Sequence, residues 1–119
     1  MPRFVVLTHD HPFLHWDLLL EAGTALRTWR LHRPPDAAGP VAAEALPEHR
    51  REYLTYEGPV SGGRGEVRRW DSGEFTLLAE TDERVDVQLA GSRLCGCARL
   101  ERSAEDANWI FSLITSEDT

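Results

Sequence analysis

The amino-acid sequence predicts an all-β fold, a small antiparallel β-barrel of about eight strands with one or two short helical turns. Three observations support this prediction. Short segments that read as strands recur along the chain, clusters of Gly, Pro, Asp and Ser separate them, and helical periodicity is weak throughout. Many short strands at this spacing are typical of closed or nearly closed antiparallel barrels.

The expected strands lie between these turn signals. In chain order they are 4–7, 15–21, 26–33, 41–46, 66–70, 74–78, 85–89, 93–100 and 109–114. The turns between them include Ala22-Gly23, 34–40, 61–63, 71–73 and Ala90-Gly91. Helical turns fit only at 48–54 and 104–107, which we expect to be connectors.

The length of the chain favours a single domain over residues 1–119. Its 119 residues suffice for one hydrophobic core, and the segment before the Pro-rich stretch 34–40 is too short to fold alone, so that stretch is expected to be a surface loop. The longest apolar run near the start, 4–7, is far shorter than a membrane span or a signal-peptide core. We therefore expect a cytoplasmic protein with no membrane partner.

Charge and cysteine content restrict the classes of ligand. The net charge of -7 opposes binding of a polyanion through bulk charge, so nucleic-acid contacts would require local basic clusters. All 13 basic residues are arginine. This pattern fits selection for the phosphate-gripping guanidinium group, although a coding bias toward Arg, Ala and Gly explains it better. Cys95 and Cys97 are expected to be reduced and to share one strand face.

The strongest candidate site lies within residues 9–17, which contain three histidines and two aspartates. On a strand, alternation places His15 and Asp17 on the same face. With His9 from the preceding segment, they would form a three-ligand metal site that leaves positions open for water or substrate. A polar strand lining a solvated barrel mouth, with hydrogen-bonded histidines, fits the spacing equally well.

A second candidate pair is His49 and Tyr53, four positions apart. A single helical turn or a compact loop would direct both side chains to one point. Next to a metal-bound phosphate they would donate to the non-bridging oxygens or supply a proton to the leaving alkoxide. As isolated residues they also fit ordinary surface positions.

Arginines also gather near two tryptophans. The two groups are Arg27, Trp29, Arg30 and Arg33, and Arg64, Arg68, Arg69 and Trp70. Such groups can hold a phosphate while the ring stacks on a base. Alternation places Arg30 on the strand face opposite to Trp29. Solvated exterior charge is the simpler interpretation for most of these arginines.

In this order, the residues resemble the 3'-phosphoesterase module of bacterial DNA ligase D, whose hallmark is His-x5-His-x-Asp. Here that motif is His9, His15 and Asp17. The resemblance covers nearly the whole chain and continues through 4–6, Leu20-Glu21, Trp29, Arg33, His49, Tyr53, Glu57-Gly58, 70–73 and 109–114. It implies a small β-barrel in which the hallmark residues bind Mn²⁺, with Zn²⁺ or Co²⁺ as alternatives, and in which His49 and Tyr53 face the phosphate.

The resemblance also implies an activity. The family removes a 3'-phosphate or a 3'-terminal ribonucleoside from DNA or RNA-containing 3' ends in DNA end repair. The implied partners are nucleic-acid 3' ends, with DNA ligase or other end-repair proteins. The implied class of enzyme is a metal-dependent phosphodiesterase and phosphomonoesterase.

Two positions depart from the family pattern: Leu19 and Val41 stand where the family has arginines expected to grip phosphate. The arginines that remain as candidates for substrate binding are Arg33, Arg50, Arg51 and Arg64. The departures support an alternative, a catalytically weak or inactive metal-binding module that recognises nucleic-acid ends or a repair partner. A phosphoesterase for a small phosphorylated metabolite is a third reading, consistent with the acidic net charge.

Overall fold

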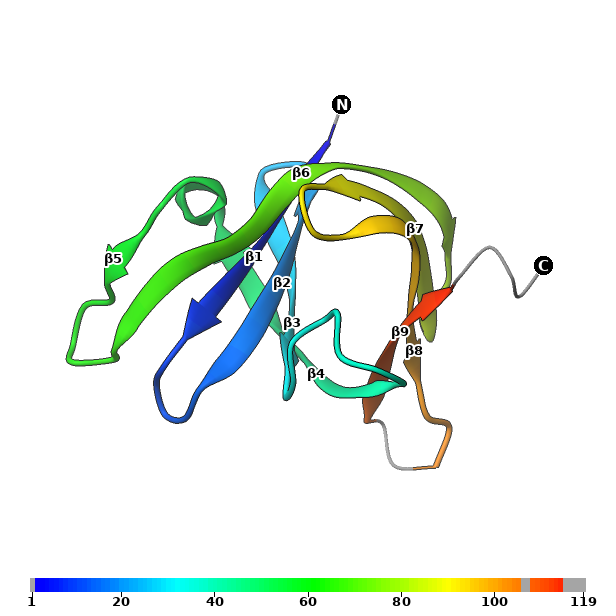
Figure 1. Ribbon diagram of the computed structural model, residues 1–119, viewed down its shortest axis with the longest axis horizontal. Coiled ribbons are helices and arrows are strands. Elements are labelled where there is room, and N and C mark those ends of the chain that lie inside the picture. Colours follow the sequence, from blue (N-terminus) through cyan, green and yellow to red (C-terminus); the bar gives the residue numbers. More distant parts are fainter. Residues whose placement is uncertain (1, 106–107, 115–119) are drawn as a thin grey trace.

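The computed structural model describes residues 2–105 and 108–114. The described strands form one antiparallel sheet in the order β1-β2-β3-β4-β9-β8-β7-β6-β5 (Figure 1). Pairing of β1 with β6 as well as β2 closes eight of these strands into a barrel, and β5 extends the sheet beyond β6. The predicted fold class is confirmed.

The element bounds follow the expected strands closely in most places. They are β1 (Arg3–His9), β2 (His15–Ala22), β3 (Ala25–Leu31), β4 (Val41–Arg50), η1 (Arg51–Leu54), β5 (Gly58–Pro59), β6 (Glu66–Glu80), β7 (Arg84–Gly91), β8 (Cys95–Arg102) and β9 (Trp109–Ile114). The short strand β5 was not predicted. The helical segment expected at 48–54 is reduced to the 3₁₀ turn η1, because β4 continues to Arg50. The helical turn expected at 104–107 lies partly outside the described residues.

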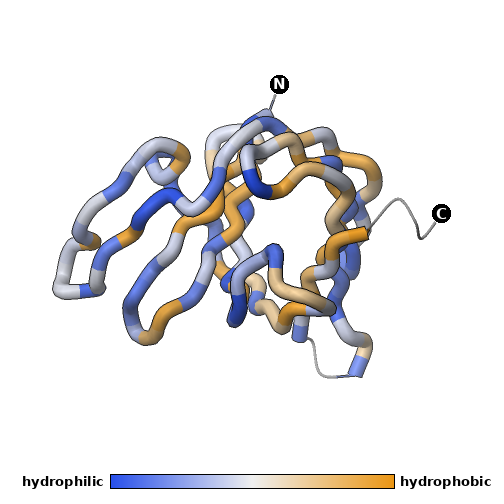
Figure 2. Tube along the Cα trace, viewed as in Figure 1, coloured by the Kyte–Doolittle hydropathy of each residue, from blue (hydrophilic) through white to orange (hydrophobic). Residues whose placement is uncertain are grey.

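Strand alternation separates two apolar clusters on opposite faces of β2. Leu18 and Leu20 pack in the barrel interior, as predicted for that face. Leu19 points to the other face and packs in a smaller cluster that includes Leu54 of η1. The face that carries His15 and Asp17 is therefore polar at one end and apolar at the other. In Figure 2 the hydrophobic residues are concentrated on the barrel strands, and the arm formed by β5 and the start of β6 is mostly hydrophilic.

The prediction of two strands separated by a turn at 71–73 is wrong, because β6 is one continuous strand of 15 residues. Asp71 is buried, and its carboxylate accepts hydrogen bonds from the backbone N–H groups of Ser92, Arg93 and Leu94. Gly73 is required for close packing: a Cβ there would lie 2.1 Å from the carbonyl oxygen of Ala90. Asp71 and Gly73 therefore make contacts with the β7–β8 connection and with β7, respectively, instead of forming a turn.

Two smaller expectations concern cysteines and membranes. Cys95 and Cys97 are free, and their thiols contact the carbonyl oxygen of Gly91 and the side-chain oxygen of Gln88. In the described part of the chain, no helix is long and apolar enough to cross a membrane.

Candidate functional site

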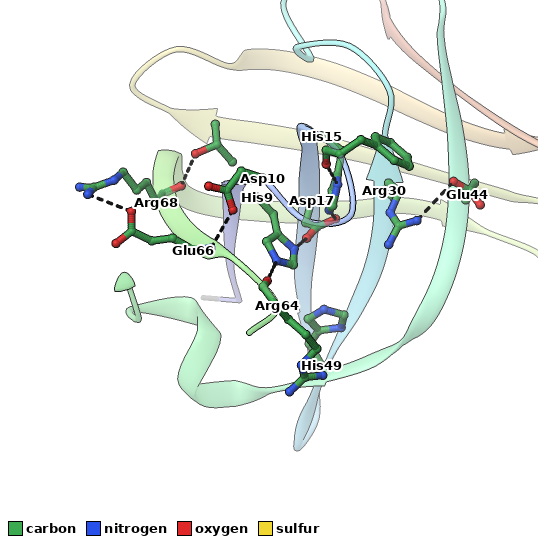
Figure 3. Close-up of polar contacts among 12 residues, drawn as sticks. His9, Asp10, His15, Asp17, Arg30, Glu44, His49, Arg64, Glu66 and Arg68 are labelled. Atoms are coloured by element: carbon green, nitrogen blue, oxygen red, sulfur yellow. Dashed lines mark hydrogen bonds and ion pairs between the residues drawn. The ribbon is translucent and has the colours of Figure 1, made fainter. Parts of the chain in front are cut away.

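The structure brings together the three residues predicted to bind metal (Figure 3). His9 ends β1 and His15 begins β2, and the antiparallel register pairs these two residues directly. Asp17 follows two positions later on the same face of β2. His9 Nδ1 lies 3.7 Å from Asp17 Oδ2, and His15 Nε2 lies 3.2 Å from Asp17 Oδ1. One possible ligand atom from each of the three residues lies within 4.8 Å of the other two.

Backbone carbonyl groups orient both imidazole rings. His9 Nε2 lies 2.8 Å from the carbonyl oxygen of Arg64, and His15 Nδ1 lies 2.8 Å from the carbonyl oxygen of Phe13. A carbonyl oxygen only accepts hydrogen bonds, so each of these nitrogens donates a proton. In the neutral ring, the opposite nitrogen then presents a lone pair toward Asp17. This arrangement is typical of histidines that bind a metal.

Two of the candidate ligand atoms are buried and lack hydrogen-bond partners among the described residues. His15 is fully buried and Asp17 is 3% exposed. Among the described residues, His15 Nε2 and Asp17 Oδ1 make no hydrogen bond. Leaving a buried acceptor unsatisfied costs about 1–3 kcal/mol. A cation between these lone pairs would remove that cost, so the donor set of two imidazoles and one carboxylate fits a divalent transition metal.

A cavity of about 220 Å³ opens next to these ligands, and we call it the site cavity. The residues that line it are Leu7, His9, His11, Pro12, Asp17, Arg30, His49, Tyr53, Val60, Arg64 and Val67. His49 from β4 and Tyr53 from η1 thus line the same cavity as His9 and Asp17, although they come from a distant part of the chain. Their ring centroids are 5.6 Å apart. His49 Nδ1 lies 3.1 Å from the carbonyl oxygen of Pro47, which leaves Nε2 as the nitrogen that can act on a ligand.

With this geometry in place, comparison with known proteins identifies the family. A family model described as the DNA Ligase D 3'-phosphoesterase domain matches residues 7–102. The chain belongs to this family. The match includes all the residues named above as metal ligands, together with His49 and Tyr53.

A curated relative in the ligase D family is the multifunctional non-homologous end joining protein LigD of Pseudomonas aeruginosa. It is 31% identical to this chain over 122 residues, which cover 92% of this chain and 14% of the relative. The chain therefore spans about one seventh of the length of this relative.

The positions at which the chain departs from the ligase D pattern are buried. Leu19 is fully buried in the small cluster that packs beneath η1, and Leu7 and Val67 of this cluster also line the site cavity. Val41 is fully buried in the barrel interior. Neither position is solvated, so an arginine at either one would require repacking of its surroundings.

The arginines predicted to bind substrate occupy different places. Arg33 donates to the carbonyl oxygen of Pro40, and Arg50 lies 3.8 Å from Glu52. Arg51 donates to the carbonyl oxygen of Gly23 at 2.7 Å. These three side chains are not part of the lining of the site cavity, and their role in substrate binding stays a prediction.

Two other arginines line the site cavity. Arg64, a candidate from the sequence, comes from the connection between β5 and β6. For Arg30 on β3, the sequence predicted only that its side chain lies on the strand face opposite to Trp29. The signal that could have found it is the predicted turn near Gly23. A two-residue turn at Ala22-Gly23 would pair Asp17 with Thr28 and His15 with Arg30, which already places Arg30 on the face of the candidate ligands. The observed turn lies one residue later, at Gly23-Thr24, and pairs Asp17 with Arg30.

Arg51 instead anchors η1 to β2. Its guanidinium lies 2.5 Å from Glu21, which also accepts a hydrogen bond from the backbone N–H of Arg3 at 2.9 Å. The pKa of Glu21 is lowered, chiefly by that hydrogen bond; burial opposes the effect, and the positive charges of Arg51 and Arg3 add to it. The anchor holds the turn that carries Tyr53.

A second anchor holds the β1–β2 loop against β6. Asp10 Oδ1 accepts a hydrogen bond of 2.8 Å from the backbone N–H of Glu66. Gly65, with a φ of +78°, passes so close that a Cβ would lie 2.2 Å from this carboxylate oxygen. The contact fixes the neighbouring carbonyl group of Arg64, which orients His9.

Proposed function

We propose that this protein is a divalent-metal-dependent phosphoesterase that acts on the 3' ends of nucleic acids, with Mn²⁺ held by His9, His15 and Asp17. The observation that carries the proposal is the pair of buried, unsatisfied ligand atoms whose lone pairs converge beside a cavity. Membership of the ligase D phosphoesterase family supports the same class of reaction.

The chemistry divides between the metal and the side chains of the site cavity. When bound, the metal supplies a Lewis acid that polarises a phosphate oxygen and positions a water or substrate hydroxyl. His49 and Tyr53 lie where they can donate hydrogen bonds to the phosphate oxygens, and His49 Nε2 can hold the proton for the leaving alkoxide. The carbonyl groups of Phe13 and Arg64 keep both ligand rings in the tautomer that the metal requires.

The proposed reaction is removal of a 3'-phosphate or of a 3'-terminal ribonucleoside, which leaves a 3'-hydroxyl. The site cavity is small, and the net charge of -7 opposes binding along a long stretch of nucleic acid. Both features favour recognition of a chain end. DNA ligase or another end-repair protein is the partner class that would use the product.

The test is hydrolysis of a primer with a 3'-phosphate or a 3'-terminal ribonucleotide, with Mn²⁺, Zn²⁺, Co²⁺ or a chelator. We expect metal-dependent product from the wild type, and loss of about 100-fold or more in Asp17→Asn and His15→Ala. The matched control is Asp82→Asn, because Asp82 is exposed and its side chain has no ion pair with any residue that the structure describes. Absence of metal-dependent product from the wild type would exclude the proposed reaction.

The burial of Leu19 favours a second candidate, a metal-binding module that recognises nucleic-acid ends without turnover. In that case the wild type would bind the 3'-phosphorylated primer in a metal-dependent way and release no phosphate. Fluorescence anisotropy of a labelled primer, measured beside the product assay, separates the two candidates.

A further inference from the structure

Arg30 is a cation with unused hydrogen-bond donors at the edge of the site cavity. It lies on β3 directly opposite Asp17, so its side chain leaves the sheet on the face that carries the metal ligands. The side chain is only 22% exposed. Its Nε atom is buried and has no hydrogen-bond partner in residues 2–105 and 108–114.

The nearest carboxylate does not satisfy this guanidinium. Arg30 NH1 lies 3.8 Å from Glu44, which is too long for a hydrogen bond. The same carboxylate oxygen of Glu44 lies 2.9 Å from His32 Nε2 and is therefore engaged more closely elsewhere. In Figure 3 the guanidinium lies between Asp17 and Glu44 and above His49.

The ring of Phe13 holds the guanidinium without using its N–H groups. The central carbon of the guanidinium lies 5.5 Å from the ring centroid, within the range of a cation–π contact. Phe13 in turn stacks on His32 at 5.8 Å with an interplanar angle of 19°. The donors of Arg30 thus remain available to a ligand while its position is restricted.

From this arrangement we infer that Arg30 grips the phosphate that reacts at the metal centre. The inference rests on the proposed function and names a residue that binds its substrate. A guanidinium offers two parallel N–H donors that match two oxygens of a phosphate group. A phosphate beside Arg30 would satisfy the buried Nε–H, and when a metal ion is held by His9, His15 and Asp17 the phosphate would face positive charge on both sides.

The other arginine of the site cavity is less free. Arg64 donates from Nε to the carbonyl oxygen of Ser61 at 2.7 Å and from NH2 to the hydroxyl of the same residue at 3.1 Å. Arg30 also accounts for the leucine at position 19. That position is two residues along β2 from Asp17, whereas Arg30 faces Asp17 from the neighbouring strand, so the chain can place a guanidinium beside the ligands without one at position 19.

The experiment compares wild type, Arg30→Gln, Arg30→Lys and the matched control Arg27→Gln, which removes an arginine of the same strand that pairs with Glu80. Circular dichroism and Mn²⁺ titration first establish that each variant folds and binds metal. Titration calorimetry then measures inorganic phosphate binding to the Mn²⁺-loaded protein, and kcat and KM are measured on the 3'-phosphorylated primer.

We expect Arg30→Gln to bind Mn²⁺ as the wild type does, and to lose at least about 10-fold in phosphate affinity and about 100-fold in kcat/KM. Arg30→Lys, which keeps the charge but not the paired donors, should lose about 10-fold in phosphate affinity. Arg27→Gln should match the wild type in all three measurements.

The outcomes separate this inference from the proposed function. Turnover and phosphate affinity that survive Arg30→Gln would overturn the role of Arg30 and leave the phosphoesterase standing. Phosphate binding that depends on Arg30 in a protein without turnover would support the role and overturn the proposed reaction. If Arg30→Gln does not fold, phosphate affinity of Arg30→Lys equal to that of the wild type overturns the paired grip.

Discussion

Replacement of Asp17 by Asn should have opposite effects on the stability of the metal-free and the metal-loaded protein. In the metal-free protein, Asp17 Oδ1 lies 3.2 Å from His15 Nε2, and neither atom has a hydrogen-bond partner among the described residues. Asparagine has nearly the same shape, and its amide group can donate to that nitrogen. The substitution thus converts two opposed acceptors into a donor and an acceptor.

The magnitude follows from the cost of the unsatisfied atoms. Removing it should raise the free energy of unfolding of the metal-free protein by about 1 kcal/mol or more. The unfolding entropy of a chain of 119 residues is about 0.25 kcal/mol/K, so each 1 kcal/mol corresponds to about 4 °C in Tm. We therefore expect Asp17→Asn in chelator to melt about 4 °C above the wild type.

The metal should reverse this order. At a free Mn²⁺ concentration of 100 times its Kd, binding stabilises the wild type by about 2.7 kcal/mol, or about 10 °C in Tm. Asp17→Asn has lost the anionic ligand and should show little of this increase. The loaded wild type should then melt above the variant.

Differential scanning calorimetry at pH 8, with chelator and with a series of Mn²⁺ concentrations, measures both effects. Asp82→Asn, at an exposed position, controls for the loss of one negative charge. A variant that is less stable than the wild type in chelator, and that keeps the full response to Mn²⁺, would refute the reasoning from unsatisfied ligands. It would show that Asp17 supports the fold and does not bind metal.

Three further predictions concern the fold around the site. Asp71→Asn should lower the free energy of unfolding by about 2 kcal/mol, because the buried carboxylate accepts three backbone N–H groups. A urea midpoint equal to that of the wild type would contradict this. The pKa of Glu21 is lowered in the folded protein, so ionised Glu21 contributes to the free energy of unfolding at pH values above the ordinary pKa of an unfolded glutamate. This contribution is lost as the pH falls through the pKa of Glu21 in the folded protein. The difference in free energy of unfolding between wild type and Glu21→Gln should be at most about 1 kcal/mol at pH 7 and should vanish on acidification. A difference that stays constant down to pH 3 would disprove this role of ionised Glu21. Leu19→Arg should lower the free energy of unfolding by several kcal/mol, because it buries an unpaired charge, and it should not raise turnover. A stable variant with higher kcat/KM would show that the wild-type site lacks an arginine there.

The clustering of the three candidate metal ligands could be predicted from the sequence because their arrangement is local. His9, His15 and Asp17 belong to one hairpin, so period-two alternation and a short loop suffice to bring them together. The same alternation predicts that Leu18 and Leu19 point to opposite faces of β2, as they do in the structure. Hydrophobic alternation and turn residues also predicted the all-β class, since each strand is short and amphipathic.

The errors occur where a distant segment decides the local structure. Asp71-Ser72-Gly73 has the composition of a turn, yet the partners of Asp71 are N–H groups about twenty residues later. Arg30 was overlooked because its relation to the site depends on pairing between β2 and β3. Local composition does not report such contacts, whereas the register of a short hairpin can be worked out once its turn is placed.

The two loops that orient the candidate metal ligands also contribute to holding the cations of the site cavity. Phe13 orients His15 through its carbonyl oxygen and holds Arg30 against its ring. Arg64 orients His9 through its carbonyl oxygen and lines the cavity with its side chain. A displacement of either loop would therefore disturb a candidate ligand nitrogen and a proposed phosphate-binding group together. Because coupling between two ligands is reciprocal, the metal and a bound phosphate should each strengthen the binding of the other in the proposed reaction.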